Sequence, residues 1–331
     1  MKRKTLAEAG EREFIRAIRD YMPSDGGRII RSSGDDSAEV DWPEREHILT
    51  TTDTFVEGVH FSREYSTMEF IGIRCMTASV SDIAAMAGLP VYSVVSLSMP
   101  SALEFDEAIA LFNGLQKTAQ HYECPIIGGE TTSTPGPLTI TVTVIGKVER
   151  GKAIYRSGAH SGDTIYVTGT LGDAMAGLYI LEKKKHGYEK LKTKFITPQA
   201  HVHLARFLAD SYNITSMIDI SDGLGIDLGH ICEESGCGAD IWAQSLPLSD
   251  EFKHFTTTFN IDSIDFAVSS GEEFELLFTS SDPLLSEQSI LNGYPVTQIG
   301  MVTKKDRGIN LHRDKMTEEP LAWKGYEHFT S

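Results

Sequence analysis

The chain has 331 residues, which is enough for two domains of ordinary size. Its apolar content of 40% is typical of a folded globular protein and excludes a disordered chain. The formal net charge of −17 argues against a dedicated nucleic-acid binder or a binder of anionic membranes, since both need a basic surface. A phosphorylated substrate is compatible with this charge, because bound cations reverse the local field.

The chain shows no targeting or membrane-spanning segment. Its N-terminus starts with basic residues and then alternates charged with apolar ones, so the apolar stretch of a signal peptide is absent. The apolar runs at 91–99 and 138–146 are too short to cross a bilayer as helices. The four cysteines form no C-x-x-C pair, and reduced thiols are expected. We therefore expect a soluble cytoplasmic protein.

The first half of the chain alternates predicted helices and strands. Phe14, Ile18 and Met22 recur every four residues and predict a short amphipathic helix. Ser66 and Glu69 have the spacing of a capping box and predict the start of a helix that runs toward residue 88. The other predicted elements are strands at 48–55, 91–99, 125–130 and 138–146 and a helix at 104–122 with apolar positions at Phe105, Ile109, Phe112, Leu115 and Ala119.

A polar, turn-rich stretch at 151–163 places the predicted domain boundary near residue 150. After it we predict strands at 163–170 and 216–221, helices at 172–185 and 223–234, two strands separated by an acidic turn within 267–280, and a loop-rich tail from 282. Alternating strands and helices indicate an α/β or α+β protein with domains at 1–150 and 151–331.

The common nucleotide-binding motifs are missing. No G-x-x-x-x-G-K-[ST] occurs, and no G-x-G-x-x-G follows a predicted strand. These absences exclude the common phosphoryl-transfer folds but not phosphoryl transfer itself.

Acidic residues recur in Gly/Ser/Thr turns next to apolar strands. Such turns occur at 34–37, 51–53, 128–131, 219–223 and 271–273. Ligand sites in α/β proteins favour strand ends, and carboxylate and hydroxyl oxygens are the ligands that Mg²⁺ selects. Asp before Gly is also ordinary turn chemistry, and a second interpretation of Ser221 or Asp222 is the cap of the next helix. Five such turns together favour a metal site, because no fold needs that many for stability.

Three single residues are further candidates. Asp82 lies at helical spacing from small and apolar residues, where a carboxylate is costly without a cation or donors, so it is a metal ligand or a donor-satisfied structural residue. Arg156, in a polar glycine-containing turn, suits a phosphate, although a surface arginine is the commoner outcome. His60 is flanked by apolar residues, and alone it is better explained as a packed core histidine.

Taken in order, these segments resemble the thiamine-monophosphate kinase family along nearly the whole chain. The matching segments are GDDSA, TTDTFVEGVHF, SVSDIAAMAG, IIGGET, YRSGA, GDTIYVTGTLGDAMAGL, IDISDGLGIDLGHI, SSGEEFELLFT and WKGYEHF. The last segment is specific, because related synthetases of the superfamily that includes aminoimidazole ribonucleotide synthetase lack it.

The resemblance implies a two-domain aminoimidazole ribonucleotide synthetase-like fold of class α/β (α+β). It implies an N-terminal domain, 1–150, that binds ATP and metal and pairs its sheet with a second subunit in a homodimer. The C-terminal α/β domain, 151–331, would complete the active site. The implied reaction phosphorylates thiamine monophosphate with ATP, giving thiamine diphosphate and ADP, with several Mg²⁺ ions and no nucleic-acid or membrane partner.

The resemblance also implies site residues, position by position. The implied metal ligands are Asp36, Thr51, Thr52, Asp53, Asp82, Glu130, Asp219 and Asp222. The implied ATP contacts are Phe112, Gly129, Glu130, Arg156 and Ser221, and the implied substrate contacts are His60, Glu272 and Tyr326. The family usually has Asp where this chain has Glu130, so a ligand at that point is expected to shift.

Phosphoryl transfer between two anionic phosphates needs positioning and charge neutralisation more than covalent chemistry, so we expect no catalytic nucleophile. Three other functions stay open at this stage. They are a sister ATP-dependent synthetase of the same superfamily, a metal-dependent phosphohydrolase and a non-enzymatic metal-binding or scaffold protein.

Overall fold

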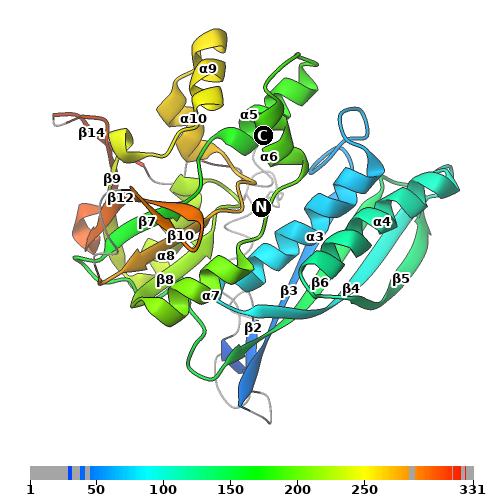
Figure 1. Cartoon of the computed structure of the whole chain (residues 1–331), viewed down its shortest axis with the longest axis horizontal. Helices are drawn as coiled ribbons and strands as arrows, with labels where there is room; N and C mark the ends of the chain where they lie inside the picture. Colours follow the sequence, from blue (N-terminus) through cyan, green and yellow to red (C-terminus); the bar gives the residue numbers. More distant parts are fainter. Residues whose placement is uncertain are drawn as a thin grey trace, which may run out of the picture.

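The computed structural model describes residues 29–31, 38–41, 45–282, 288–314, 316–321 and 325. The predicted opening helix and two of the candidate site residues, Asp36 and Tyr326, lie outside these residues. The labels below are those of Figure 1.

The first half of the chain forms a six-stranded sheet in the order β1-β2-β3-β6-β4-β5, in which only β4 and β5 pair in parallel. Two helices, α3 and α4, cover one face of this sheet (Figure 1). The elements are β1 (Ile29–Arg31), β2 (Ala38–Asp41), β3 (Glu46–Val56), α3 (Met68–Ala85), β4 (Leu89–Pro100), α4 (Phe105–His121), β5 (Ile126–Thr134) and β6 (Thr139–Glu149).

Strand β3 shows how the sequence sorts side chains between the two faces of the sheet. Leu49 and Thr51 are buried toward the helices, whereas Thr52 and Thr54 are exposed on the other face. The exposed threonines bond across the sheet to hydroxyl groups of β6, each at 2.9 Å. This two-residue alternation is what a strand buried on one face requires.

Helix α3 lies close to its predicted range but begins differently. Its N-cap is Thr67, whose side chain accepts a hydrogen bond from the Phe70 backbone, so the predicted capping box at Ser66 is wrong by one residue. The helix ends where Ala87 adopts a φ of +55°. Most faces of α3 carry apolar or small residues, because the helix packs on its own sheet, on α4 and on the second half of the chain.

Helices α3 and α4 approach closely through two glycines. A Cβ atom at Gly72 would lie 2.3 Å from the Leu111 carbonyl oxygen, and one at Gly114 would lie 2.0 Å from the Glu69 carbonyl oxygen. Both neighbours are backbone atoms, so only a shift of a whole helix can make room.

Gly114→Ala is therefore expected to destabilise the protein by about 1–3 kcal/mol, since overpacking at the helix contact outweighs the gain in helix propensity. The measurement is urea unfolding of purified protein. Gly136→Ala is the control, because a Cβ atom there meets a side chain only at 3.5 Å. Equal stability of the two variants would contradict the close helix contact.

The predicted apolar positions of α4 divide between two environments. Leu115 and Ala119 are fully buried against α3, as is Leu111. Phe105, Ile109 and Phe112 are instead 78%, 44% and 40% exposed. The outer face of α4 is thus apolar and open in a single chain.

The second half forms a sheet in the order β14-β13-β9-β12-β7-β10-β8, with β11 paired to β12. All pairs except β13–β9 are antiparallel, so both sheets are of the α+β kind. The strands are β7 (Thr164–Thr168), β8 (Ile214–Asp219), β9 (Cys237–Trp242), β10 (Leu276–Ser280), β11 (Gln288–Leu291), β12 (Tyr294–Lys304), β13 (Ile309–His312) and β14 (Glu318–Pro320). The helices are α5 (Asp173–Glu182), α6 (Glu189–Ile196), α7 (Val202–Ser211), α8 (Leu224–Ser235), α9 (Asp250–Phe259) and α10 (Ser263–Ser269), with 3₁₀ turns at Ala243–Ser245 and Lys305–Arg307.

Two predictions for the second half are wrong. Only one strand, β10, lies within 267–280, because residues 263–269 form α10, whose N-cap Asp262 accepts two backbone hydrogen bonds. The described part of the tail from 282 contains four strands, β11 to β14, that were predicted as loop. Three of these strands have only three or four residues, and the 11 residues of β12 do not alternate regularly between buried and exposed, so periodicity does not reveal them.

One hydrophobic core cluster joins the two halves, and a second cluster lies within the second half alone. The first cluster joins residues of the first sheet and α3, such as Leu49 and Ile83, to Leu204 of α7 and Met217 of β8. Helix α3 contacts α6, α7 and β8 and so lies between the halves (Figure 1). Among the helices that the structure describes, none has the length and apolar character needed to cross a membrane.

Candidate functional site

A pocket of about 370 Å³ lies between the two halves of the chain. Its walls come from β3 and the segment after it, from α3, from α5, from the loop after β8 and from the loop before β10. The lining residues are Asp53, Phe55, Val59, His60, Tyr65, Ala78, Asp82, Met175, Leu178, Glu182, Asp219, Ser221, Asp222, Ser269, Gly271, Glu272 and Phe274. Seven of the sequence-predicted site residues are among them: Asp53, His60, Asp82, Asp219, Ser221, Asp222 and Glu272.

Strand β3 and helix α3 position two of the carboxylates. Thr51 and Asp53 are two residues apart on β3 and both reach α3. The Thr51 hydroxyl donates to Asp82 Oδ2 at 2.5 Å, and the Ser79 hydroxyl donates to Asp53 Oδ2 at 2.6 Å. Each carboxylate is therefore held at one oxygen by a hydroxyl from the other element.

Helix α3 also holds a carboxylate of the second half. The Ser81 hydroxyl donates to Asp219 Oδ2 at 2.6 Å, which connects the two halves directly. Asp219 is the last residue of β8 and is only 1% exposed. A buried carboxylate at a strand end is costly unless donors or cations compensate it.

The Asp227 side chain holds the loop between Asp219 and α8 in place. Asp227 Oδ2 accepts hydrogen bonds from the backbone amides of Ser221, Asp222 and Gly223, at 3.0–3.2 Å. Gly223 has a φ of +118°, a conformation that L side chains rarely adopt. Burial, together with the charges of Asp222 and Asp219, raises the pKa of Asp227 well above its ordinary value. The loop is thus a tight turn that concentrates negative charge at the pocket wall.

The acidic loop before β10 has an unusual backbone. Glu272 and Phe274, both facing the pocket, have φ values of +57° and +51°, which are uncommon for residues other than glycine. The Glu272 amide donates to the Ser221 carbonyl oxygen at 2.8 Å. A Cβ atom at Gly271 would lie 2.5 Å from that same oxygen, so only glycine fits there. The two acidic loops of the second half are therefore bound to each other.

The end of the pocket away from the aspartates is aromatic. Phe55, Tyr65 and Phe274 line it together with His60, which is T-shaped to Phe55 with ring centroids 6.0 Å apart. His60 Nδ1 accepts a hydrogen bond from the Val56 amide at 3.0 Å. His60 is thus both packed against an aromatic ring, as the sequence alternative proposed, and part of the pocket wall.

Several candidate residues do not line this pocket. Thr51 contacts it only through Asp82, and Thr52 lies on the opposite, exposed face of the sheet. Gly129, Glu130 and Phe112 are exposed on β5 and α4. Arg156 does not line the pocket either, and its charge partly opposes the rise in the Asp227 pKa that burial and the two neighbouring aspartates cause.

The C-terminal segment comes close to the site at one described residue. A Cβ atom at Gly325 would lie 2.3 Å from the Asp222 carbonyl oxygen. At Gly325 the chain therefore packs against the loop between Asp219 and α8.

Sequence reasoning missed four residues that shape the site: Arg74, Ser79, Ser81 and Asp227. The serines read as part of a small-residue stripe on α3, and Asp227 reads as an ordinary residue of the first turn of α8. No sequence signal marks the two serines, because their roles depend on the packing of β3 and β8 against α3.

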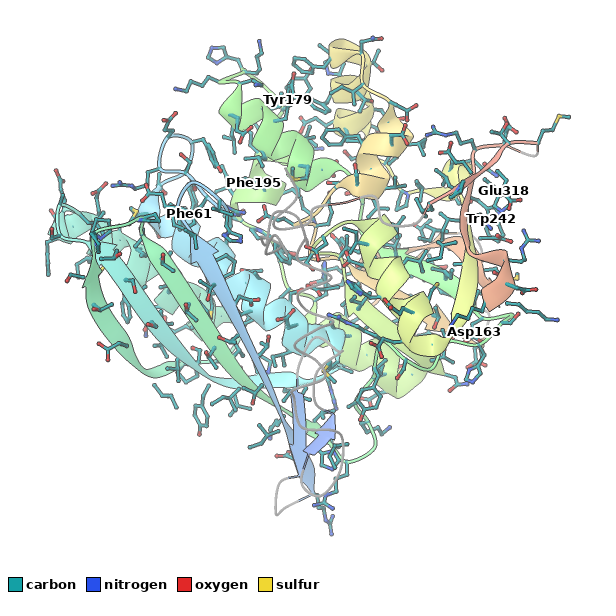
Figure 2. The ribbon with its side chains drawn as sticks, turned by 180° about the vertical axis from the view of Figure 1, so that it is seen from behind. Phe61, Asp163, Tyr179, Phe195, Trp242 and Glu318 are labelled. Carbon is teal, nitrogen blue, oxygen red and sulfur yellow. The ribbon has the colours of Figure 1, made fainter. Side chains whose placement is uncertain are left out.

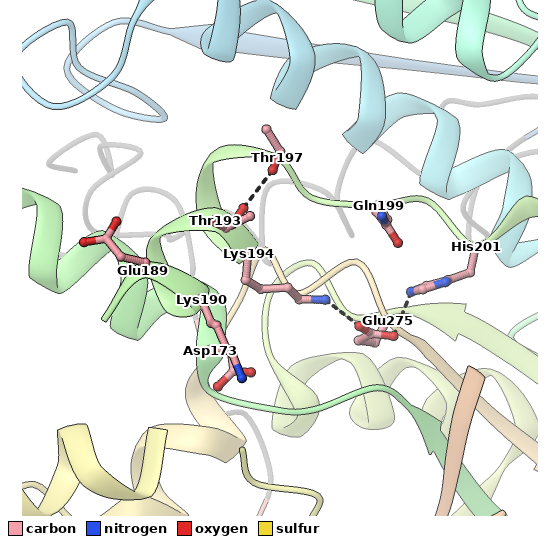
Figure 3. A pocket seen from close by; sticks show the side chains of 9 residues that line it. All are labelled: Asp173, Glu189, Lys190, Thr193, Lys194, Thr197, Gln199, His201 and Glu275. Atoms are coloured by element: carbon pink, nitrogen blue, oxygen red, sulfur yellow. Dashed lines mark hydrogen bonds and ion pairs between the residues drawn. The ribbon is translucent and has the colours of Figure 1, made fainter. Parts of the chain in front are cut away.

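A second pocket, of about 440 Å³, lies on the second half and is shown in Figure 3. None of the sequence-predicted site residues that the structure describes lines it. Lys194 of α6 and His201 reach Glu275 from opposite sides, and His201 Nε2 lies 2.8 Å from Glu275 Oε2. Thr168 also donates to Glu275, at 2.5 Å. This buried ion cluster joins α6 to β7 and β10.

The donor set of the interdomain pocket favours a hard cation. Asp53, Asp82, Asp219, Asp222 and Ser221 offer only oxygen atoms, and no cysteine lines the pocket. Oxygen ligands of this kind suit Mg²⁺, which commonly shares carboxylates with substrate phosphates. The arrangement can bind phosphates through cations at one end and a flat organic group at the other.

Comparisons with protein-family models and with known relatives agree with this description of the site. The model of the AIR synthase related protein N-terminal domain matches residues 34–148, and that of the C-terminal domain matches residues 160–311. The chain is 32% identical to a thiamine-monophosphate kinase of Aquifex aeolicus, covering 97% of this chain and 99% of that one. It is 34% identical to the thiamine-monophosphate kinase of Escherichia coli, with the same coverage of both chains.

Solved structures agree with these relatives. A structure described as AaThiL complexed with AMPPCP and TMP matches with a TM-score of 0.83 and 32% identity, covering 99% of each chain. The hydrogenase maturation protein HypE in complex with ATP matches with a TM-score of 0.69 and 18% identity, covering 97% of each chain. The latter likeness concerns the fold alone.

Proposed function

Because the chain belongs to the thiamine-monophosphate kinase family, within the AIR synthase related proteins, we propose that it transfers the γ-phosphate of ATP to thiamine monophosphate, forming thiamine diphosphate and ADP. The observation that carries the proposal is the two-ended interdomain pocket. Its acidic end suits cation-bound phosphates, and its aromatic end, with Phe55 and Phe274, suits the flat, cationic thiamine rings. The relative bound to AMPPCP and TMP supports the same pair of substrates.

The residues present fit Mg²⁺, since carboxylates from both halves line the same pocket and offer only oxygen donors. Asp53, Asp82, Asp219 and Asp222 would hold the ions, with Asp36 as a further expected ligand. When bound, Mg²⁺ supplies the positive charge that offsets the repulsion between the two substrates' phosphates. Thr51, Ser79 and Ser81 keep three of these carboxylates oriented through the hydrogen bonds described above.

In the proposed reaction a phosphate oxygen of thiamine monophosphate attacks the γ-phosphorus of ATP, and the bond to the β–γ bridging oxygen breaks as ADP leaves. The attacking oxygen is already ionised near neutral pH, so the chain needs no strong general base. Its contribution is to position the two phosphates in line and to exclude water between the two halves. No phosphoenzyme is expected.

The roles of the remaining candidate residues depend on the roles that we propose for the two domains. We assign ATP and metal binding and dimerisation to residues 1–150 and completion of the site to residues 151–331. The exposed face of the first sheet, its edge strand β5 and the apolar face of α4 suit pairing with a second copy. Such pairing would cover Gly129, Glu130 and Phe112, which line no part of the pocket in one chain and are assigned to ATP and its metal. The contact at Gly325 supports Tyr326 as a substrate residue.

The test is the acceptor dependence of ADP release by purified protein in the presence of ATP and Mg²⁺. Thiamine monophosphate should stimulate ADP release strongly, whereas thiamine, which lacks the phosphate acceptor, should not. ADP release that is indifferent to both compounds would indicate a phosphohydrolase, and no release in any mixture would contradict the proposal.

A further inference from the structure

Arg74 of α3 is a buried cation at the aromatic end of the pocket. It is only 6% exposed, and its Nη2 donates to Glu272 Oε2 at 2.6 Å. Its guanidinium carbon lies 3.9 Å from the centre of the Phe195 ring. Arg74 belongs to the first half, whereas Glu272 and Phe195 belong to the second. Figure 2 places Phe195 where α6 faces α3.

The position of Arg74 on α3 relates it to the phosphate end of the pocket. Arg74, Ala78 and Asp82 are spaced by four residues, so they follow one face of the helix. Ala78 and Asp82 line the main pocket, and Arg74 lines a small cavity that shares Ala78 and Glu272 with it. Eight residues of helix correspond to about 12 Å, so one rigid element carries both the phosphate-end carboxylate and the partner of Glu272.

Glu272 has three features that call for a fixed partner. Its backbone adopts a φ of +57°, its amide is bound to the Ser221 carbonyl, and its side chain is 28% exposed toward the pocket. Near it, Tyr65 and Glu182 also line the pocket. Burial raises the pKa of Tyr65; the charges of Glu182 and Glu272 add to this rise, and that of Arg74 opposes it. These groups therefore act on one another electrostatically at the organic end of the pocket.

Burying a guanidinium is costly when its hydrogen-bonding capacity is incompletely used. Arg74 Nε is buried and finds no hydrogen-bond partner in the described part of the chain. A long apolar side chain such as methionine can make the packing contact with Phe195 without the cost of burying a charge. The ion pair to a pocket-lining carboxylate is what the charge adds.

We infer that Arg74 is a positioning residue for substrate recognition: it fixes the Glu272 carboxylate against the organic end of the pocket and acts on thiamine monophosphate only through that carboxylate. The inference rests on the proposed function. Arg74 has no contact with ATP or with the phosphates in this inference, because the phosphate end of the pocket is lined by Asp82, two helical turns away.

The test is a cycle of Arg74→Met, Glu272→Gln and the double variant, with the Michaelis constants for both substrates measured separately. Arg74→Met is expected to raise the constant for thiamine monophosphate about tenfold, the size expected for losing a hydrogen bond to a charged group. The constant for ATP should stay nearly unchanged. The double variant should match Glu272→Gln alone, because Arg74 has no further target once the carboxylate is gone.

Wild-type turnover in the same assay separates this inference from the proposed function. With an active wild type, an unchanged constant for thiamine monophosphate, equal weakening of both substrates, or multiplying effects in the double variant would overturn the inference and make Arg74 structural. If Arg74→Met does not fold, Arg74→Leu carries the same comparison, since it also removes the charge that pairs with Glu272 and keeps an apolar side chain beside Phe195.

Discussion

Asp53→Asn is expected to lower turnover by about 10²–10³-fold, the size known for removing one group that stabilises charge in a transition state. The amide keeps an oxygen to accept from Ser79, so the hydrogen bond between β3 and α3 survives. The negative charge that would hold a cation is lost. Steady-state thiamine diphosphate formation at saturating ATP measures the effect, and urea unfolding should show almost no change.

Asp210→Asn is the control for this variant. Asp210 is half exposed on α7, where it faces Lys152 at 3.8 Å outside the pocket, so its charge should not affect turnover. Full activity of Asp53→Asn at limiting Mg²⁺ would remove Asp53 from the metal site.

Glu275→Gln should lower the free energy of unfolding by about 3 kcal/mol, at the lower end of the range for breaking a buried ion pair because Lys194 retains some access to the second pocket. The substitution leaves Lys194 and His201 facing a neutral amide (Figure 3). Burial alone would raise the pKa of Glu275, but the charges of His201 and Lys194 outweigh it and hold the pKa below its ordinary value.

The sign of the pH dependence follows from this lowered pKa. The stabilisation is present above the ordinary glutamate pKa and is lost as pH falls below it, since the folded protein then resists a proton that the unfolded chain accepts. Urea unfolding at neutral and acid pH should therefore show the variant and the wild type converging in acid. Glu189→Gln, exposed on the same helix as Lys194, is the control and should stay within about 0.5 kcal/mol of wild type. Equal stability of both variants at neutral pH would contradict the buried pair.

Much of the first half could be predicted because its elements have strong local signals. Strand β3 alternates buried and exposed side chains, and α3 ends before a glycine, so their ranges follow from the pattern. The end of α10, residues 267–269, was predicted as part of a strand because a helix of seven residues is too short to show helical periodicity. The cap at Thr67 rather than Ser66 reflects the usual uncertainty of one residue between adjacent hydroxyl side chains.

Some residues of the site could be predicted from the sequence, and others could not. Asp53, Asp82, Asp219 and Asp222 could be singled out from sequence because carboxylates near strand ends or within an apolar helix face are physically costly. The partners that orient them could not, because Ser79 and Ser81 acquire their roles only when β3 and β8 lie on either side of α3. The role of Arg74 could not be predicted for the same reason, because its partner, Glu272, is 198 residues away in sequence.

The fate of the γ-phosphate of ATP tests the central claim most directly. With ATP labelled in that phosphate, Mg²⁺ and thiamine monophosphate, the label should appear in the terminal phosphate of thiamine diphosphate, in equal amount to the ADP formed. Label released as inorganic phosphate, with no thiamine diphosphate formed, would contradict direct transfer between two substrates held in the interdomain pocket.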